Sequence, residues 1–523
     1  MPRLTGQQIE AFFAAVADED LLHSRYGIER ETLRVDAAGA LAMTPHPAAL
    51  GSALTHPSIT TDFSEALLEF VTGAVSQPWE VIQELCDVHR FTYDRIGDET
   101  LWPLSMPCTV MHDEAIPLAR YGNSNVGRMK TAYRRGLGHR YGRAMQTIAG
   151  IHFNFSPAAS FWRQLASARG DERAPGEFQS AAYFALLRNF RRYAWLVLYL
   201  FGASPAVCRS FLDGRDHALQ LFDSDTLYLP NATSLRMSDL GYTSAAQARL
   251  NISLNSLDEY VAGLTRAIQT PYPPYAKIGL RNGDQWRQLS SNILQIANEF
   301  YSVVRPKRVA NSGEKPTSAL RDRGVEYVEI RALDVNPFDP VGVGQNQVRF
   351  MECFLLFCAV CNCEVISSAE QVDVEFNQLE VAARGRAPQL TLRCGGKPRA
   401  LREWSLAIFD QLSIIATRLD RAAGGGHYVD AVSAYRDSVE DPSLTPSARV
   451  LDAMRDGRRS HADFGVELAG EHKNYFRDME PLQPERMAAL LDSVDASLAR
   501  QRDIEAADAV SFEDYLRDYF ASR

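Results

Sequence analysis

Two glutamates stand two residues apart in a stretch that alternates as a β-strand does. The stretch YGIERETLRV, residues 26–35, places Glu29 and Glu31 on one face and Ile28 and Arg30 on the other. Two neighbouring carboxylates repel each other unless a positive group lies over them. Because carboxylate oxygens bind hard divalent cations, one interpretation is a metal site. The other is a solvated strand face whose acids pair with arginines.

Three later stretches repeat this division into an apolar and a polar face. They are TTDFSEALLEFVTG (residues 60–73), IHFNFS (151–156) and GVEYVEIRALDV (324–335). An antiparallel sheet accepts such strands, with its apolar face on helices and its polar face along a cavity. The polar set is Glu29, Glu31, Asp62, Glu65, Glu69, His152, Glu329 and Arg331. Its acids and histidine suit Mg²⁺ or Mn²⁺, although Glu65 could equally orient an arginine.

Basic residues suggest an anion site near these acids. Arg305 and Lys307 end one expected strand, and the stretch from Arg120 to Gly150 is basic and rich in glycine and aromatic residues. That stretch could bind nucleic acid, but the net charge of -10 favours a local substrate or anion site. The phosphate motif G-x-x-x-x-G-K-[ST] is absent, and Gln347 takes the third glycine position after Gly342 and Gly344. ATP would therefore bind through metals and basic side chains.

Composition excludes several classes of protein. The acidic balance argues against general binding of nucleic acid or anionic membranes, and no apolar run is long enough to cross a bilayer. The first residues predict an amphipathic, acidic helix without the features of a signal peptide, so we expect a cytoplasmic protein.

The cysteines allow two interpretations. Cys353, Cys358 and Cys361 have the C-x4-C-x2-C spacing of some iron–sulfur proteins. The surrounding sequence VRFMECFLLFCAVCNC is continuously apolar, however, and this favours a buried helix with free thiols.

The remaining chain is expected to be mostly helical. Helices are predicted over about 79–97, 177–201 and 256–270, and a strand over 291–308. From about residue 345 the chain should be mainly helical to its end. We expect residues 1–345 to form a catalytic β-sheet core with inserted helices, and residues 346–523 to form a mainly helical part packed on that core, together one structural unit.

Long stretches in chain order resemble the proteobacterial type of the glutamate–cysteine ligase (γ-glutamylcysteine synthetase) family. They include GIERETLRV, GSALTHPSITTDFSEALLEFVT, WPLSMPC, YGNSNVGRMKTAYRRGLGHRYG, MQTIAGIHFNFS, ATSLRMSDLGY, RPKR and EYVEIRALDVNPF. The resemblance implies an α+β fold, in which a curved antiparallel β-sheet funnel of the glutamine-synthetase-like kind is flanked by helices. It also implies ATP-dependent ligation of the L-glutamate γ-carboxylate to the L-cysteine amine through γ-glutamyl phosphate, the first step of glutathione biosynthesis.

The resemblance also implies roles for single residues. The implied metal ligands, for Mg²⁺ or Mn²⁺, are Glu29, Asp62, Glu69, His152, Glu329 and, more weakly, Glu31. The implied substrate-binding residues are Tyr133, Arg134, Gln146, Tyr242 and Tyr301, with Arg236 as the clamp for a substrate carboxylate and a catalytic residue. Arg331 is expected to meet the transferring phosphoryl group, and Arg305 and Lys307 to bind ATP. A monomer with glutathione as feedback inhibitor is expected.

Ala297, in the segment LQIANEFY, departs from the acidic residue that this family pattern leads us to expect, while Glu299 and Tyr301 remain. The chain also lacks a second ATP-binding domain, so we do not expect the bifunctional enzyme that adds glycine as well. Two other functions stay open: an ATP-dependent carboxylate–amine ligase that accepts a different amine, and a non-catalytic regulator that keeps the fold.

Overall fold

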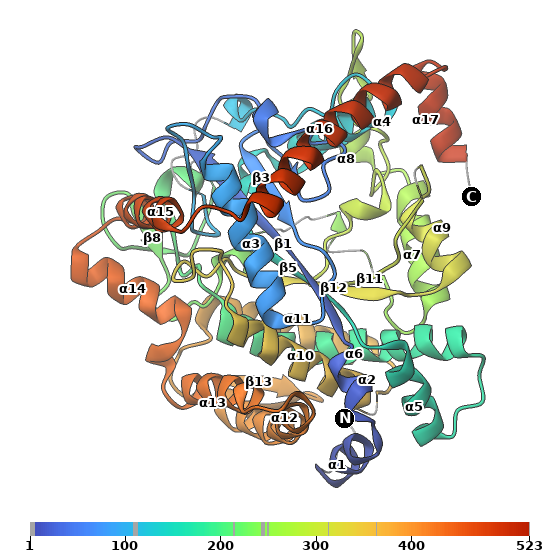
Figure 1. Cartoon of the computed structure of the whole chain (residues 1–523), viewed down its shortest axis with the longest axis vertical. Coiled ribbons are helices and arrows are strands. Elements are labelled where there is room, and N and C mark those ends of the chain that lie inside the picture. Colours follow the sequence, from blue (N-terminus) through green and yellow to red (C-terminus); the bar gives the residue numbers. More distant parts are fainter. Residues whose placement is uncertain are drawn as a thin grey trace.

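The computed structural model describes residues 6–107, 113–212, 215–241, 246–247, 250, 252–311, 313–361 and 363–521. Among these residues the largest sheet has seven strands (Figure 1). They are β1 (Arg25–Val35), β2 (Ile59–Thr61), β3 (Leu67–Val71), β4 (Thr100–Leu101), β5 (Ile151–Ser156), β11 (Val304–Lys307) and β12 (Tyr327–Leu333). Their order is β11-β12-β5-β1-β3-β2, β4 pairs with the end of β1, and every pairing is antiparallel.

The strand pairing brings the apolar residues of the sheet together on one face. Ile28 of β1 stands opposite Phe153 of β5, which stands opposite Ile330 of β12, and all three are buried. Alternation along each strand therefore sends the intervening polar residues to the other face. This confirms the predicted division into two faces for residues 26–35, 151–156 and 324–335.

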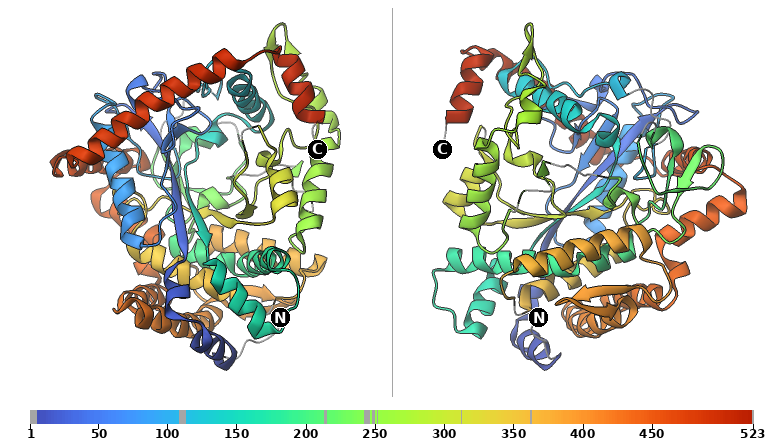
Figure 2. Two further views of the ribbon diagram at one scale, coloured as in Figure 1. Left: turned by 45° about the vertical axis from the view of Figure 1, so that its right-hand side comes forward. Right: turned by 180° about the vertical axis from the view of Figure 1, so that it is seen from behind.

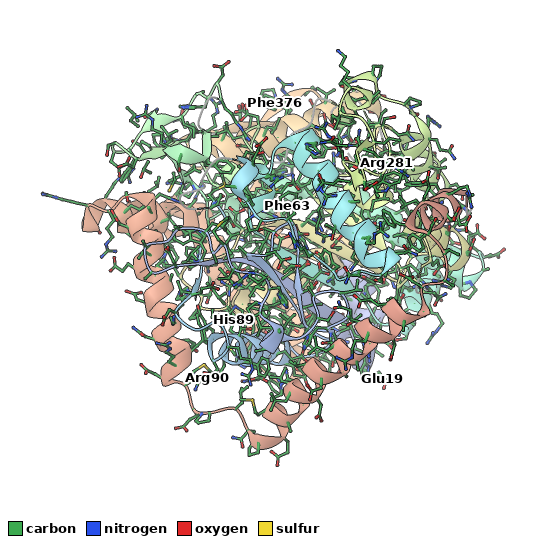
Figure 3. The ribbon with its side chains drawn as sticks, turned by 90° about the horizontal axis from the view of Figure 1, so that it is seen from above. Glu19, Phe63, His89, Arg90, Arg281 and Phe376 are labelled. Carbon is green, nitrogen blue, oxygen red and sulfur yellow. The ribbon has the colours of Figure 1, made fainter. Side chains whose placement is uncertain are left out.

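Helices cover the apolar face. They include α3 (Pro78–Tyr93), which packs against β1 and β3, α6 (Pro175–Phe201), which packs against β11 and β12, and α10 (Gln345–Val360), which packs against both helices. His89 of α3, labelled in Figure 3, is fully buried. Cys353, Cys358 and Cys361 lie buried as free thiols on or next to α10, and burial raises the pKa of each. The buried-helix interpretation is therefore confirmed.

The other helices surround this core (Figure 2). They are α1 (Gly6–Ala15), α2 (Asp18–Leu22), α4 (Asn125–Tyr141), α5 (Ala159–Arg169), α7 (Leu257–Gln269), α8 (Pro273–Ala276), α9 (Pro316–Arg323), α11 (Ser368–Arg384), α12 (Leu401–Ala423), α13 (His427–Glu440), α14 (Pro446–Gly457), α15 (His461–Asp478), α16 (Pro484–Ala507) and α17 (Phe512–Ala521). Smaller sheets join β6 (Ala206–Cys208), β7 (Gln220–Leu221) and β8 (Thr226–Tyr228), β9 (Arg281–Asn282) and β10 (Gln285–Trp286), and β13 (Thr391–Cys394) and β14 (Lys397–Ala400).

The helices at both ends of the chain pack against segments that are distant in the sequence. The N-terminal helices α1 and α2 pack on α12. At the other end of the molecule, α16 runs toward α4, and α17 packs on α4 (Figures 1 and 2). Among the described residues, no helix combines the length and apolarity that crossing a bilayer requires.

The strand predicted over 291–308 is wrong for most of its length. Only Val304–Lys307 forms a strand, and Ala297–Glu299 forms a single 3-10 turn. The buried Glu299 carboxylate accepts hydrogen bonds from the Gln295 backbone N–H at 2.6 Å and the Tyr141 hydroxyl at 2.6 Å. These bonds hold the segment in an irregular path that local alternation does not reveal.

Candidate functional site

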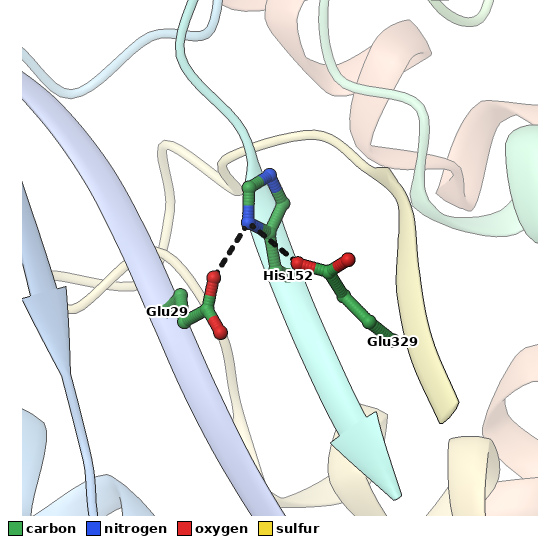
Figure 4. A group of neighbouring side chains, drawn as sticks. All are labelled: Glu29, His152 and Glu329. Atoms are coloured by element: carbon green, nitrogen blue, oxygen red, sulfur yellow. Dashed lines mark hydrogen bonds and ion pairs between the residues drawn. The ribbon is translucent and has the colours of Figure 1, made fainter. Parts of the chain in front are cut away.

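The register of the sheet gathers acidic residues from three strands, and His152 from a fourth, onto its polar face. Glu29 stands opposite His152, Glu31 stands opposite Glu69, and Glu329 stands opposite Asn154. Directly opposed residues of an antiparallel pair have neighbouring side chains, so strands distant in sequence form one cluster. Figure 4 shows Glu29, His152 and Glu329 of this cluster converging from β1, β5 and β12.

His152 lies at the centre of the acids. Its Nδ1 is 2.9 Å from Glu29 Oε2 and 3.8 Å from Glu329 Oε1, and its Nε2 is 3.7 Å from Glu31 Oε1. Two groups have ligand atoms within 4.8 Å of one another: Glu29, His152 and Glu329, and Glu31, Glu69 and His152. The buried His152 Nε2 has no hydrogen-bond partner among the described residues. Oxygen donors around one imidazole form a set that fits a hard divalent cation.

Burial and neighbouring charges divide the carboxyl groups into two kinds. Burial, and then the nearby Glu29 carboxylate, raises the pKa of Glu69 well above its ordinary value, and burial also raises that of Glu31. Burial opposes ionisation of Glu29 and Glu329 as well. The hydrogen bond with His152 nevertheless lowers the pKa of Glu29, and Lys307 and then Arg331 lower that of Glu329 well below its ordinary value.

Cations approach the acids from β11 and β12. Lys307 Nζ lies 3.2 Å from Glu329 Oε2, and Arg331 NH1 lies 3.0 Å from Glu329 Oε1. Arg305 stands opposite Glu329 in the register, and its guanidinium donates to the Asn298 and Phe300 carbonyls. The three cations line the same cavity as the acids, and its volume is about 1170 Å³.

Helix α4 forms another wall of this cavity. Lys130, Tyr133 and Arg134 line it one helical turn apart, and Gln146 lines it from the turn Ala144–Thr147. Burial, and then Arg134, lowers the pKa of Lys130 to about 8. The predicted anion site in the basic stretch did not single out Lys130, although its spacing of three and four residues from Tyr133 and Arg134 on a helix was the available signal.

Asp62 lies in the loop between β2 and β3. It lines the cavity, but its side chain is 41% exposed, its Oδ1 is 4.0 Å from Arg134 NH2, and it belongs to neither group of potential ligands. Glu65 does not share the polar face of β3, because it precedes that strand. Its carboxylate instead accepts the backbone N–H groups of His46 at 2.5 Å and Arg120 at 2.6 Å. Its inclusion in the polar set is therefore wrong.

Arg236 enters the cavity from the loop that follows β8. It is 1% exposed, its NH2 donates to the Arg331 carbonyl at 2.9 Å, and its NH1 lies 3.6 Å from Asp334 Oδ1. A Cβ atom on Gly150 would lie 2.1 Å from Arg236 NH2, so glycine is needed there for the guanidinium to pass. Tyr301 lines the same cavity, with its hydroxyl 3.2 Å from Met237 Sδ. Tyr242 lies outside the described residues.

The sheet and its helical cover define a mixed helix and antiparallel-sheet protein with a large cavity of acids and cations on the open face of the sheet. The family model for glutamate–cysteine ligase matches residues 9–381. Glutamate–cysteine ligases of Pseudomonas paraeruginosa and Azotobacter vinelandii are 49% identical over 513 residues and 50% identical over 516, each alignment covering 98% of this chain and 97% of the relative.

Solved structures of similar fold point to the same family. The crystal structure of glutamate–cysteine ligase from Francisella tularensis in complex with AMP has a TM-score of 0.90 and 38% identity, covering 95% of this chain and 98% of that one. A bifunctional glutathione synthetase from Pasteurella multocida has a TM-score of 0.70 and 26% identity, covering 90% of this chain and 54% of that one. The chain belongs to the glutamate–cysteine ligase family, and the resemblance in its sequence is confirmed.

Proposed function

We propose that this chain catalyses the ATP-dependent ligation of the L-glutamate γ-carboxylate to the L-cysteine amine, with γ-glutamylcysteine, ADP and phosphate as products. One observation carries the proposal beyond family membership. Acids from three strands, His152 from a fourth, and the cations Arg305, Lys307 and Arg331 line a single cavity. A site that brings a triphosphate to a carboxylate needs both kinds of group, because every reactant is an anion.

The reaction proceeds in two steps. A γ-carboxylate oxygen of glutamate bonds to the γ-phosphorus of ATP, and the bond from that phosphorus to the ADP oxygen breaks. The cysteine amine then bonds to the carbonyl carbon of γ-glutamyl phosphate, loses a proton, and phosphate leaves. Arg331 and Lys307, already held on Glu329, stabilise the negative charge of the transferring phosphoryl group.

Different residues of the cavity bind the different substrates. Arg236 clamps a substrate carboxylate and takes a catalytic part, because its buried guanidinium can form paired hydrogen bonds. Tyr133, Arg134, Gln146, Tyr242 and Tyr301 surround the cysteine-derived part of the product, and Arg305 binds ATP with Lys307 and Arg331.

The acids hold Mg²⁺, or alternatively Mn²⁺. The ligands are Glu29, Asp62, Glu69, His152 and Glu329, with Glu31 as a weaker member. The donor set and the unpartnered His152 Nε2 support this assignment. Bound ions supply charge neutralisation between the carboxylates and the ATP phosphates.

The finer architecture is also part of the proposal. The sheet forms a curved, glutamine-synthetase-like funnel, and the irregular register between Ile330 and Leu333 on β12 supports curvature there. Residues 1–345 form the catalytic core and residues 346–523 a helical part packed on it. The seven main strands all lie before residue 345, and α10 to α17 follow, which supports this division.

The cellular setting completes the proposal. We place the enzyme in the cytoplasm as a monomer, with glutathione as its feedback inhibitor and without nucleic-acid or membrane partners. Gel filtration with light scattering tests the monomer. Inhibition by glutathione that glutamate relieves tests the regulation.

One assay tests the activity. ADP release is measured with glutamate, with and without cysteine and with and without Mg²⁺, and the product is identified by mass. We expect turnover only with all components and the mass of γ-glutamylcysteine. Turnover with 2-aminobutyrate or another amine but not with cysteine would indicate a ligase of different specificity, and the absence of ATP cleavage would indicate a non-catalytic regulator.

A further inference from the structure

The chain between β10 and β11 reaches the main cavity without regular secondary structure to hold it. Residues 287–303 contain one 3-10 turn, Ala297–Glu299, and neither a strand nor an α-helix. Tyr301 lines the cavity near the end of this segment, and the Phe300 carbonyl accepts a hydrogen bond from the Arg305 guanidinium. Because backbone groups outside helices and strands need other partners, side chains decide where this segment lies.

Glu299 supplies the central partner. Its side chain is fully buried, and both of its carboxylate oxygens accept hydrogen bonds. Oε1 accepts from Arg140 NH1 at 2.8 Å and from the Tyr141 hydroxyl at 2.6 Å, and Oε2 accepts from the Gln295 backbone N–H at 2.6 Å. Glu299 belongs to neither group of potential metal ligands. Its carboxylate therefore joins parts of the protein to one another.

Arg140 connects this carboxylate to the last turn of α4. Its side chain is also fully buried, and its NH2 donates to Gln288 Oε1 at 2.9 Å and to the Ser290 carbonyl at 2.6 Å. A buried ion pair loses so much hydration that apolar residues of the same size often stabilise a fold as well. The distinct contribution of this pair is geometric, because one planar guanidinium holds α4 and the irregular segment in a single arrangement.

Two short paths lead from Glu299 to residues of the cavity. The Glu299 carbonyl accepts from Gln247 Nε2 at 2.9 Å, and Gln247 Oε1 accepts from the Tyr301 backbone N–H at 2.8 Å. In addition, the carbonyls of the two residues on either side of Glu299 accept from Arg305 NH2. A displacement of Glu299 therefore moves both the backbone of Tyr301 and the acceptors that orient the Arg305 guanidinium.

We propose that Glu299 is a positioning residue for two substrates at once. Held by Arg140, it places Tyr301 for the cysteine side of the cavity and Arg305 for ATP, and this rests on the roles that the proposed function gives to those two residues. Glu299 itself touches no reacting atom. Disturbing its carboxylate should weaken binding on both sides, whereas disturbing Gln247 should weaken binding on the cysteine side alone.

Binding of a non-hydrolysable ATP analogue tests the ATP side without any need for turnover. Calorimetry with Mg²⁺ and the β,γ-imido analogue of ATP measures the dissociation constant. In Glu299→Gln we expect that constant to rise by about 2- to 10-fold, the equivalent of one hydrogen bond. An unaltered protein that performs no ligation, but binds the analogue more tightly than Glu299→Gln does, would refute the ligase activity and support the positioning of Arg305.

Steady-state kinetics test the cysteine side. Glu299→Gln should raise the KM for cysteine by about 2- to 10-fold with a smaller change in kcat, because substrate contacts are misplaced while the reacting groups remain. Gln247→Leu removes the bond to the Tyr301 backbone at nearly constant size. It should raise the KM for cysteine and leave the dissociation constant of the ATP analogue unchanged, and a rise in that constant would contradict the two separate paths.

Glu99→Gln is the matched control. Glu99 pairs with the buried Arg34 at 2.5 Å, and neither residue is among those that line the main cavity. The control should lower the melting temperature without changing the KM for cysteine or the affinity for the analogue. If Glu299→Gln does not fold, the double variant Arg140→Gln/Glu299→Gln provides the same comparison, since it leaves neither charge buried alone. Unchanged analogue affinity and unchanged KM for cysteine in the folded variant would overturn the proposal, because Glu299 would then only stabilise the fold.

Discussion

At the scale of single residues, the cluster combines two kinds of carboxyl group. Glu29 and Glu329 have lowered pKa values, because His152, Lys307 and Arg331 favour their ionised forms. Glu31 and Glu69 have raised pKa values, because burial outweighs the cations near them. Without a divalent ion, the buried carboxyl groups of Glu31 and Glu69 destabilise the fold. Such a loss of stability is expected at a site whose function is to bind positive charge.

Glu69→Gln should therefore stabilise the metal-free protein at neutral pH and remove its activity. Gln cannot ionise, so the variant avoids the buried charge, while kcat should fall by about 100-fold or more because charge stabilisation in the transition state is lost. Thermal unfolding in EDTA and the ADP-release assay measure the two effects.

Glu65→Gln is the matched control. It should lower the free energy of unfolding by about 1–3 kcal/mol, because one backbone N–H loses its carboxylate acceptor. A melting temperature that falls for Glu69→Gln as it does for Glu65→Gln would contradict the distinction between a ligand and a structural acid.

Gly150→Ala should displace the Arg236 guanidinium, since the added Cβ would lie 2.1 Å from its NH2. We expect a loss of about 1–3 kcal/mol in stability from overpacking, and a rise in the KM for glutamate or for cysteine, whichever carboxylate Arg236 holds, that exceeds any rise in the KM for ATP. Gly176→Ala on α6 is the control, because nothing lies within 4 Å of its added methyl group. Equal KM values for glutamate and for cysteine in Gly150→Ala and the unaltered enzyme would show that Arg236 does not hold a substrate carboxylate.

The sequence alone could predict a common face for residues within regular strands, because their side chains alternate. It gave a wrong prediction for Glu65, which lies in a turn before its strand. Glu29, Glu31, His152 and Glu329 lie within regular strands, so their common face could be predicted. Glu65 has the same spacing from Glu69 that two strand residues would have, but the strand begins only at Leu67. The hydrogen bonds that occupy Glu65 come from His46 and Arg120, and no local pattern links these positions.

At the scale of elements, α17 holds the outer side of α4. The Phe512 and Trp286 rings pack edge to face with their centroids 5.8 Å apart. The Arg128 Cζ atom of α4 lies 4.4 Å from the centroid of the Phe512 ring. Phe512 forms a small apolar cluster with Met129 and Ala132, separate from the main core, and Trp286 packs against it. Tyr133 packs against the same cluster, and it lines the main cavity together with Arg134. The end of the chain thus supports a wall of the site in space, and no sequence pattern indicates that pairing.

Phe512→Ala should loosen α4 without unfolding the core. We expect the contact between α17 and α4 to lose about 2–3 kcal/mol of stabilisation, because the Phe512 ring is buried in a cluster at the periphery of the molecule. The KM for cysteine should rise several-fold while the main thermal transition moves little. Val510→Ala is the control, because that side chain is 52% exposed. A loss of kcat at unchanged KM for cysteine would argue against a positioning role for α17.

At the scale of the whole molecule, the general architecture could be predicted because each main strand has a clear apolar face, and the helices from Gln345 onward have clear periodicity. The pairing order β11-β12-β5-β1-β3-β2 could not, since it joins strands separated by long helical insertions. That order nevertheless decides the chemistry, because it makes Glu29 the neighbour of His152 and Glu31 the neighbour of Glu69.

The same order makes the stability of the molecule depend on divalent ions, and this dependence grows with pH. Because the pKa values of Glu31 and Glu69 are raised in the folded state, that state retains protons that the unfolded state loses, and the metal-free protein becomes less stable as pH rises above the ordinary glutamate range. Mg²⁺ binding requires those carboxylates to be ionised, so its stabilisation grows as pH rises. Scanning calorimetry is run at about pH 6 and about pH 8.5, with EDTA or with one fixed Mg²⁺ concentration, about 100 times the dissociation constant measured at pH 8.5. The difference in the free energy of unfolding should approach about 2.7 kcal/mol at pH 8.5 and be smaller at pH 6. In Glu69→Gln this difference should shrink at both values. A difference independent of pH, or equal in Glu69→Gln and the unaltered protein, would mean that the ions stabilise some other part of the molecule.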